Sequence, residues 1–210
     1  MHKINKQKPL ADFSDFVNKN HPQQWEDLPS MVRSNSRLQI LVFEQDCLCG
    51  YTEMILDEDS NSSHIDHFVK RDHDPQRIFD WNNLIVSTID EDYGGKYKDN
   101  KYKIQKNKYE SIFNPIVDDM SQYIQYCENG EMVAKEGVDL NTKQKVEETI
   151  KAFNLNHSSL KRKRADLILE LSTYLNQKEL LDDPAVKKAF VNRGFVSLWN
   201  WYIKNNNPSK

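Results

Sequence analysis

The residue types that could carry out chemistry are concentrated between positions 64 and 84 of this 210-residue sequence. Asp66 and His67 are adjacent, and Asn83 follows after a charged loop. A carboxylate such as Asp66 can hold a hard divalent cation through oxygen. The imidazole of His67 titrates close to working pH and can take a proton from water near that cation. Asn83 can fix the loop or orient the histidine through its amide. The three residues predict a metal-dependent centre that cleaves phosphodiester bonds.

Two motifs carry a resemblance to a known family. HIDHF begins at His64 and WNNL begins at Trp81. This order resembles that of the HNH (ββα-metal) endonucleases and, more narrowly, the PtuB-like nucleases of Septu- and retron-associated anti-phage defence. The resemblance covers roughly residues 37 to 164. The other matching segments are residues 37–38, 43–45, 49–53, 113–115, 149–150 and 155–156, with Arg162 or Arg164.

The resemblance implies a role for each residue of the centre. His67 would be the general base, Asp66 a ligand of one divalent ion, and Asn83 the structural asparagine. No residue matches the family's final histidine or asparagine ligand. By order along the chain Asp92 is the nearest candidate for that ligand, and Asp90 is the next. Oxygen ligands favour Mg²⁺ or Mn²⁺ over zinc.

No structural zinc is predicted. Many relatives hold a zinc with two cysteine pairs, whereas here only Cys49 matches the first pair and Thr52 stands at its second position. Residues near Thr88 and Tyr93 replace the later pair. Because a structural zinc needs four ligands, we expect packing and hydrogen bonds to hold the segment that contains Cys49 and Thr52.

A plainer interpretation would be preferred without the resemblance. His64 and His67 would then be ordinary polar residues of a strand. The spacing to the WNNL motif and the flanking matches favour the nuclease. For His64 itself, orienting the loop, binding phosphate and having no role all stay open.

The centre must be placed by short strands. Residues 49–56 and 64–69 have strand-like composition. In an ideal strand His67 would face one side and Asp66 the other. Both can therefore reach one metal–water unit only if the strand ends or bulges at this point.

Helical patterns surround these strands, so we predict an α+β fold with a small ββα-metal core in a mostly helical single domain. The predicted parts are an N-terminal helical arm (1–46), the HNH nuclease core (47–112) and a C-terminal helical lobe (113–210). Within the lobe we expect helices over 115–127, from 141 to 153 and after 158–159, where the apolar face continues to Tyr174 and Leu175. A last helix is expected from Asp183-Pro184, and its aromatic stripe through Tyr202 is interpreted as core or as a docking face.

Lysines alternate with tyrosines after residue 95, which suits contacts to phosphates and bases. The alternative is a solvated β-ribbon, and the run 161–164 is by itself typical of a solvated face. The predicted nucleic-acid contacts are Lys96, Lys98, Lys101, Lys103, Arg162 and Arg164.

The net charge, the length of the apolar runs and the cysteine count limit the class of protein. A net charge of −3 argues against a general polyelectrolyte binder, so phosphate affinity must come from a local patch or a partner. No apolar run approaches the ~20 residues of a membrane span. No signal peptide is recognised, and the cysteine count of three predicts a reducing, cytoplasmic setting.

Taken together, we predict a metal-dependent HNH endonuclease acting on DNA or RNA. No Gly-rich nucleotide-binding loop is present, so control would come from an ATPase subunit, PtuA-like by resemblance. The alternative is a catalytically degenerate HNH-fold adaptor that binds the ATPase or nucleic acid.

Overall fold

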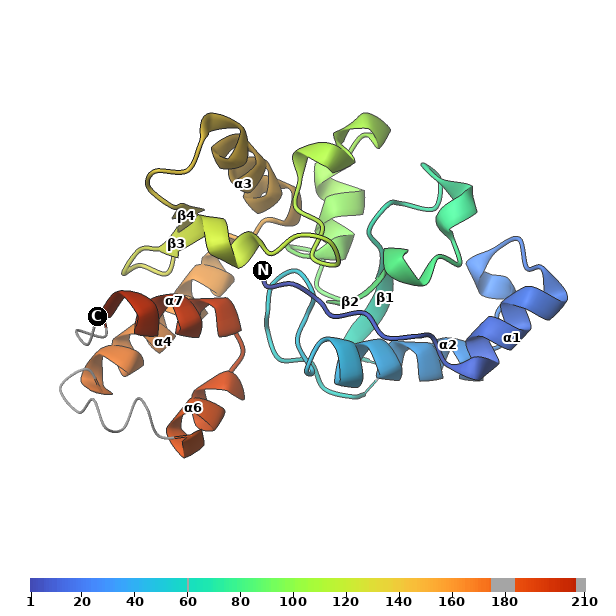
Figure 1. Ribbon diagram of the computed structural model, residues 1–210, viewed down its shortest axis with the longest axis horizontal. Coiled ribbons are helices and arrows are strands. Elements are labelled where there is room, and N and C mark those ends of the chain that lie inside the picture. Colours follow the sequence, from blue (N-terminus) through green and yellow to red (C-terminus); the bar gives the residue numbers. More distant parts are fainter. Residues whose placement is uncertain (60, 175–183, 207–210) are drawn as a thin grey trace.

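The computed structural model describes residues 1–59, 61–174 and 184–206 (Figure 1). Helices α1 and α2 lie at one end, the strand pair β1–β2 in the middle, and α4, α6 and α7 at the other end. The predicted α+β class is confirmed. The elements are α1 Ala11–Asn20, α2 Ser30–Leu38, β1 Ser63–His67, β2 Leu84–Thr88, β3 Ile124–Tyr126, β4 Met132–Ala134, α3 Leu140–Phe153, α4 Ser158–Tyr174, α6 Pro184–Val191 and α7 Val196–Asn206.

Helix α2 continues as a π-helical segment, Gln39–Glu44, that points its end at the strand pair. The buried side chain of Gln45 then bonds the backbone of β2, donating to Val86 O at 2.9 Å and accepting from Val86 N at 2.8 Å. Glu44 accepts a hydrogen bond from Trp81 Nε1 at 2.9 Å and pairs with Lys6 Nζ at 2.5 Å. These contacts fix the start of β2 against the helical arm.

Strands β1 and β2 form a two-stranded antiparallel sheet in which Asp66 lies opposite Ile85 and His67 opposite Leu84. The predicted strand over 49–56 is wrong: this segment is a knuckle of turns with one isolated bridge, between Leu48 and Ile55. Its backbone forms hydrogen bonds within the segment, to β2 and to Phe195, without forming a regular strand ladder. Gly50 N donates to Val86 O, and a Cβ on Gly50 would lie 2.4 Å from the Ile85 side chain. Only glycine permits this approach.

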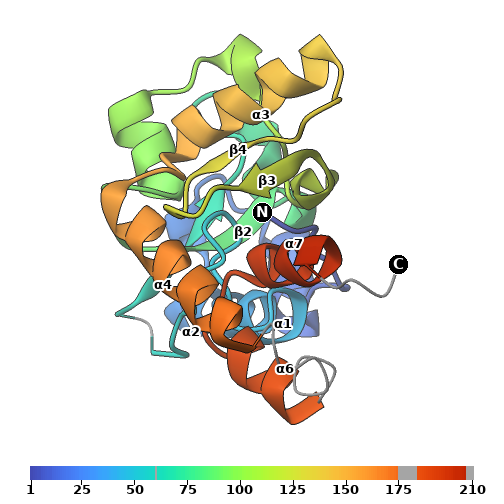
Figure 2. The ribbon, with the colours of Figure 1, turned by 90° about the vertical axis from the view of Figure 1, so that its left-hand side faces the viewer.

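The second sheet, β3–β4, lies between α3 and α7 (Figure 2). The helix predicted over 115–127 is wrong, because this stretch forms a short 3₁₀ turn, Met120–Tyr123, followed by β3. The turn of the hairpin contains Gly130 at φ 76°, and a Cβ there would meet Lys161 O of α4 at 2.0 Å. The hairpin therefore packs with its backbone against α4.

The C-terminal aromatic stripe belongs to the core. Its buried members are Phe195, Leu198, Trp199 and Tyr202. One helix was expected after Pro184, but α6 and α7 are separate, and Gly194 (φ 84°) and Phe195 (φ 54°) form the break. There Phe195 N donates to Glu53 O, which docks α7 on the knuckle. Of the predicted helical positions, Leu175 and Asp183 lie outside the described residues, as does the side chain of Tyr174.

The helices that the structure describes include none that is both long and apolar enough to cross a lipid bilayer.

Arg164 of α4 ties the C-terminal elements together from inside the core, where only 1% of it is exposed. Its guanidinium donates to Gly130 O at 2.6 Å, to Leu155 O at 2.8 Å and to Asn156 Oδ1 at 3.0 Å. A buried guanidinium that donates to these three acceptors is a structural clamp between the hairpin and the α3–α4 connection.

Replacing Arg164 by Met should lower the free energy of unfolding by about 3 kcal/mol, because buried carbonyl acceptors lose their donors. Chemical denaturation of the purified chain measures this. The exposed neighbour Arg162 provides the matched control, and Arg162→Ala should change stability by no more than about 0.5 kcal/mol. Equal effects of the two substitutions would contradict the clamp.

Candidate functional site

Asp66 and His67 are the last two residues of β1, and both are buried, with 5% and 7% of their surfaces exposed. After β2 the chain forms a helical segment, residues 95–102, that lies over the Asp66–His67 pair. The elements therefore follow the strand–strand–helix order expected of a ββα unit. The segment begins against Asp66: a Cβ on Gly95 would lie 2.6 Å from Asp66 Cγ. The strand ends at His67, as a shared site for the two residues requires.

The imidazole of His67 is held in one orientation. Its Nε2 donates to Ile78 O at 2.9 Å, and the ring lies edge-on to Trp25 with centroids 5.0 Å apart. Burial lowers the pKa of His67, against the opposing effects of the Ile78 carbonyl and of Asp66. A neutral imidazole with its proton on Nε2 leaves Nδ1 as an acceptor. No described residue donates to Nδ1, and this atom is not sealed from solvent as His64 Nδ1 is.

Asn83 shapes the loop that carries this carbonyl. The residue is fully buried; its Oδ1 accepts from Val69 N at 2.8 Å, and its Nδ2 donates to Val69 O and to Arg77 O at 3.0 and 3.1 Å. Because Ile78 follows Arg77 directly, the amide of Asn83 sets where the acceptor of His67 lies. Asn83 acts through the loop and does not contact the imidazole by a hydrogen bond.

Asp66 belongs to a buried polar cluster with Tyr51, Lys98 and Asp99. Tyr51 donates its hydroxyl to Asp66 Oδ2 at 2.5 Å. The ammonium of Lys98, which has 0% exposure, lies 3.5 Å from Asp66 Oδ2 and 2.6 Å from Asp99 Oδ1, and donates to His67 O at 3.2 Å. This cluster joins the knuckle, the end of β1 and the helical segment.

The charges in this cluster depend on one another. Burial alone would lower the pKa of Lys98, but the charges of Asp66 and Asp99 outweigh it and raise the pKa, so the amine stays an ammonium. Burial, and then the charge of Asp66, raises the pKa of Asp99 to about 6. Burial and the neighbouring Asp66 likewise raise the pKa of Tyr51 well above its usual value, so its hydroxyl remains a donor.

These residues do not fit a divalent ion as they stand. Two carboxylates face the centre, but a lysine ammonium already lies between them, and Gly95 offers no side chain. Among the described residues no group of three or more His, Cys, Asp or Glu side chains is placed to hold a metal. Mg²⁺ requires near-octahedral oxygen coordination, which two carboxylates already paired with an ammonium do not supply.

The candidate ligands taken from chain order lie elsewhere. Asp92 is on an exposed loop, where its carboxylate pairs with Lys101 at 2.5 Å and its N–H donates to Asp90 Oδ1 at 2.8 Å. The carboxylate that the structure brings to Asp66, through Lys98, is that of Asp99. Sequence reasoning missed Asp99 because the residues after 95 are interpreted there as a lysine–tyrosine surface for phosphates and bases, with a solvated β-ribbon as the alternative. A helical interpretation would place Asp99 one turn after Gly95.

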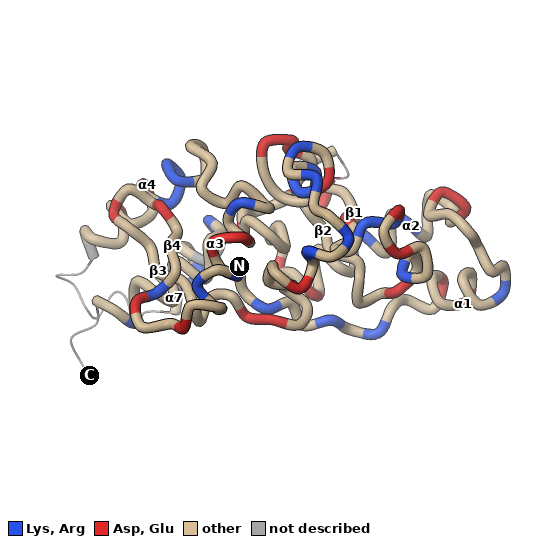
Figure 3. Tube along the Cα trace, turned by 90° about the horizontal axis from the view of Figure 1, so that it is seen from above, with Lys and Arg blue, Asp and Glu red and all other residues tan. Residues whose placement is uncertain are grey.

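Of the six residues predicted to contact nucleic acid, two are buried and four reach solvent. Lys98 and Arg164 are buried and hold backbone and side-chain groups of the protein. The four that reach solvent are Lys96, Lys101, Lys103 and Arg162. Acidic and basic residues are interspersed along the trace (Figure 3). Tyr97–Tyr102 is π-helical, so the alternative of a β-ribbon is wrong.

Hydrogen-bond contacts connect Cys49 with β2 and with the helical segment. Cys49 Sγ lies 3.8 Å from Ser87 Oγ, and Ser87 Oγ accepts from Gly95 N at 3.1 Å. The knuckle, β2 and the helical segment are thereby joined without cysteine pairs. The other cysteines are half-buried (Cys47) and exposed (Cys127).

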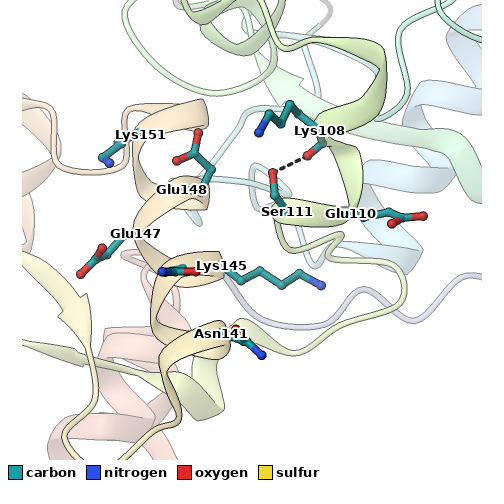
Figure 4. A pocket seen from close by; sticks show the side chains of 9 residues that line it. Lys108, Glu110, Ser111, Asn141, Lys145, Glu147, Glu148 and Lys151 are labelled. Carbon is teal, nitrogen blue, oxygen red and sulfur yellow. Dashed lines mark hydrogen bonds between the residues drawn. The ribbon is translucent and has the colours of Figure 1, made fainter.

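A cavity of about 480 Å³ opens between α3 and the 3₁₀ segment Lys106–Ser111 (Figure 4). Its walls carry both charges, with lysines at 108, 145 and 151 beside glutamates at 110, 147 and 148. None of the predicted catalytic residues lines it, so it is separate from the Asp66–His67 centre.

The fold and the centre thus define an α+β protein with a buried acid–histidine pair at a strand end. No protein-family model matches the chain. The chain is similar to Septu protein PtuB of Bacillus thuringiensis, with 27% identity over 184 residues, which cover 74% of this chain and 69% of that protein. This similarity supports a relation to the Septu defence proteins.

We expect the ring of His67 to titrate below its usual value of 6.5, because burial disfavours the imidazolium. As pH falls through 6.5, the unfolded chain gains a proton that the folded chain resists, so the free energy of unfolding decreases. Histidine-resolved NMR gives the midpoint, and His67→Gln should flatten the pH dependence of stability. The pKa of His64 is lowered in the same direction and adds to this slope, whereas protonation of Asp99, whose pKa is raised to about 6, opposes it. A His67 midpoint above 6.5 would contradict this picture.

Asn83→Ala should lower the free energy of unfolding by about 2–3 kcal/mol, since it leaves buried backbone groups without partners. Hydrogen exchange at the Val69 amide should accelerate by a larger factor than the loss of overall stability alone would produce. The exposed neighbour Asn82 is the matched control, and Asn82→Ala should leave exchange at Val69 unchanged. Unaltered exchange in Asn83→Ala would show that the amide does not hold the loop.

Proposed function

We propose that this protein is a component of an anti-phage defence system of the Septu type and acts there as an HNH-like, phosphodiester-cleaving subunit. The similarity to Septu protein PtuB supports the defence setting. The observation that carries the activity is His67, whose Nε2 is tied to Ile78 O while Nδ1 is left to accept a proton.

In this proposal His67 takes a proton at Nδ1 from the water molecule that attacks phosphorus, the bond from phosphorus to the 3′-oxygen breaks, and the departing 3′-oxygen takes a proton from solvent, which leaves a 5′-phosphate end. Asn83 keeps the 69–77 loop, and with it the Ile78 carbonyl, in the arrangement that holds the imidazole. The nucleic-acid backbone would be bound by the solvent-accessible cations Lys96, Lys101, Lys103 and Arg162. Whether the substrate is DNA or RNA is decided by experiment.

Two further parts of the proposal come from the resemblance alone. An ATPase subunit would supply control in trans. A requirement for Mg²⁺ or Mn²⁺, with Asp66 as a ligand, is what the resemblance implies, but the buried cluster does not fit such an ion as it stands, and no step of the proposal depends on it.

The second candidate is a non-cleaving adaptor with a degenerate HNH-like fold. The observation that favours it is Lys98, whose buried ammonium pairs with Asp66 where a nuclease of this class would need an ion. In that case Asp66 and Lys98 stabilise the fold, and the protein binds its partner or nucleic acid without cleaving it.

Cleavage of plasmid DNA and total RNA by the purified chain separates the two candidates, with and without Mg²⁺ or Mn²⁺ and a candidate ATPase. If His67 is the base, His67→Ala should reduce cleavage by about 100-fold or more while circular dichroism shows a retained fold. His73 is the matched control, because it lies in the same region and bonds Tyr109 through Nδ1. His73→Ala should cleave like the wild type.

Activity only with the ATPase present would support a controlled effector. No cleavage of either polymer under any of these conditions, or equal cleavage by wild type and His67→Ala, would overturn the catalytic proposal. The first of these results would leave the adaptor.

A further inference from the structure

We propose that Lys98 is a built-in cation that takes the place of a divalent ion at this centre, so that the folded chain excludes Mg²⁺ and Mn²⁺ from Asp66. The proposal concerns ion binding and holds whether or not the protein cleaves nucleic acid.

The first argument is the position of the ammonium. Lys98 Nζ lies between two carboxylates, 3.5 Å from Asp66 Oδ2 and 2.6 Å from Asp99 Oδ1, and its third neighbour is His67 O at 3.2 Å. The ammonium donates hydrogen bonds to Asp99 Oδ1 and His67 O, and Asp66 Oδ2 lies at ion-pair distance. The same oxygens are the ones that a cation at the end of β1 would bind.

The second argument is that the surroundings of Asp66 leave little room for an ion beside the ammonium. Tyr51 already donates to Oδ2. The backbone of Gly95 lies against the carboxylate, since a Cβ there would be 2.8 Å from Oδ1 and 2.9 Å from Oδ2. No side chain fits at position 95 in this packing, so the segment contributes only backbone at this point.

The third argument is energetic. Lys98 has 0% exposure, so an ion that displaced its ammonium would leave a buried charge without its partners. Breaking a buried pair in this way is strongly destabilising. The ion would gain two carboxylates in return, and Mg²⁺ gives up its water reluctantly. The ammonium is therefore the favoured occupant while the segment 95–102 keeps its position.

The test is Mn²⁺ binding by the full chain, which electron paramagnetic resonance and calorimetry measure. Wild type should show no saturable binding that Asp66→Asn removes. Lys98→Ala should gain one Mn²⁺ per chain and bind it at least about tenfold more tightly than wild type, because two facing carboxylates lose their competitor. The double variant Lys98→Ala with Asp66→Asn should lose the gain.

Two further variants make the result specific. Lys98→Gln keeps most of the side-chain volume and a donor but removes the charge, so it should also gain Mn²⁺ binding if Lys98→Ala is too unstable to study. Lys101→Ala is the matched control, because it frees the exposed carboxylate of Asp92 on the same segment. This control should gain no saturable site.

Saturable binding of one Mn²⁺ by wild type that Asp66→Asn abolishes would overturn the proposal directly. So would folded Lys98→Ala and Lys98→Gln proteins that gain no binding. If neither variant folds, wild type decides: no Asp66-dependent binding and no thermal stabilisation by Mn²⁺ support exclusion, and either effect overturns it. Because the readout is binding, a failure here is distinct from a failure of the proposed nuclease activity.

Discussion

The ion pair between Lys98 and Asp66 is the interaction on which the rest of this centre depends. It is sealed from water, and a buried carboxylate without a counter-charge would be strongly destabilising. The ammonium meets this need and also binds the carbonyl of His67, so it fixes the end of β1. The helical segment 95–102 must lie across the strand pair for Lys98 to reach this position. The charge requirement at Asp66 thereby determines the packing of a whole element.

Two close backbone approaches make that packing sterically feasible. Gly50 lets the knuckle lie on β2, and Gly95 lets the helical segment lie on the carboxylate of Asp66. Asn83 and Gln45 satisfy the backbone of the neighbouring loop and strand. Short strands and loops such as these have few ladder hydrogen bonds of their own, so buried side-chain amides supply the missing partners.

The same arrangement separates two properties that usually occur together in a hydrolytic centre. His67 is oriented, neutral and left with a free acceptor, which suits a base. The cation beside it is a lysine, which suits a stable fold. A centre of this kind can keep the strand–strand–helix framework and the oriented histidine while its ion-binding function is altered. The presence of the framework is thus a weaker guide to activity than the chemistry of the individual donors.

By itself the amino-acid sequence predicted the α+β class and a strand that carries the Asp66-His67 pair, and it left Asn83 either to fix the loop or to orient the histidine. The strand follows from local composition, and the ββα arrangement follows from the resemblance to the HNH endonucleases. Only the tertiary structure decided that residues 49–56 are a knuckle, that Lys98 and Arg164 are buried, and that Asp99 and not Asp92 approaches Asp66. Lysines and aspartates are solvated by default, and what buries them is contact between segments far apart in the chain, which no local spacing records.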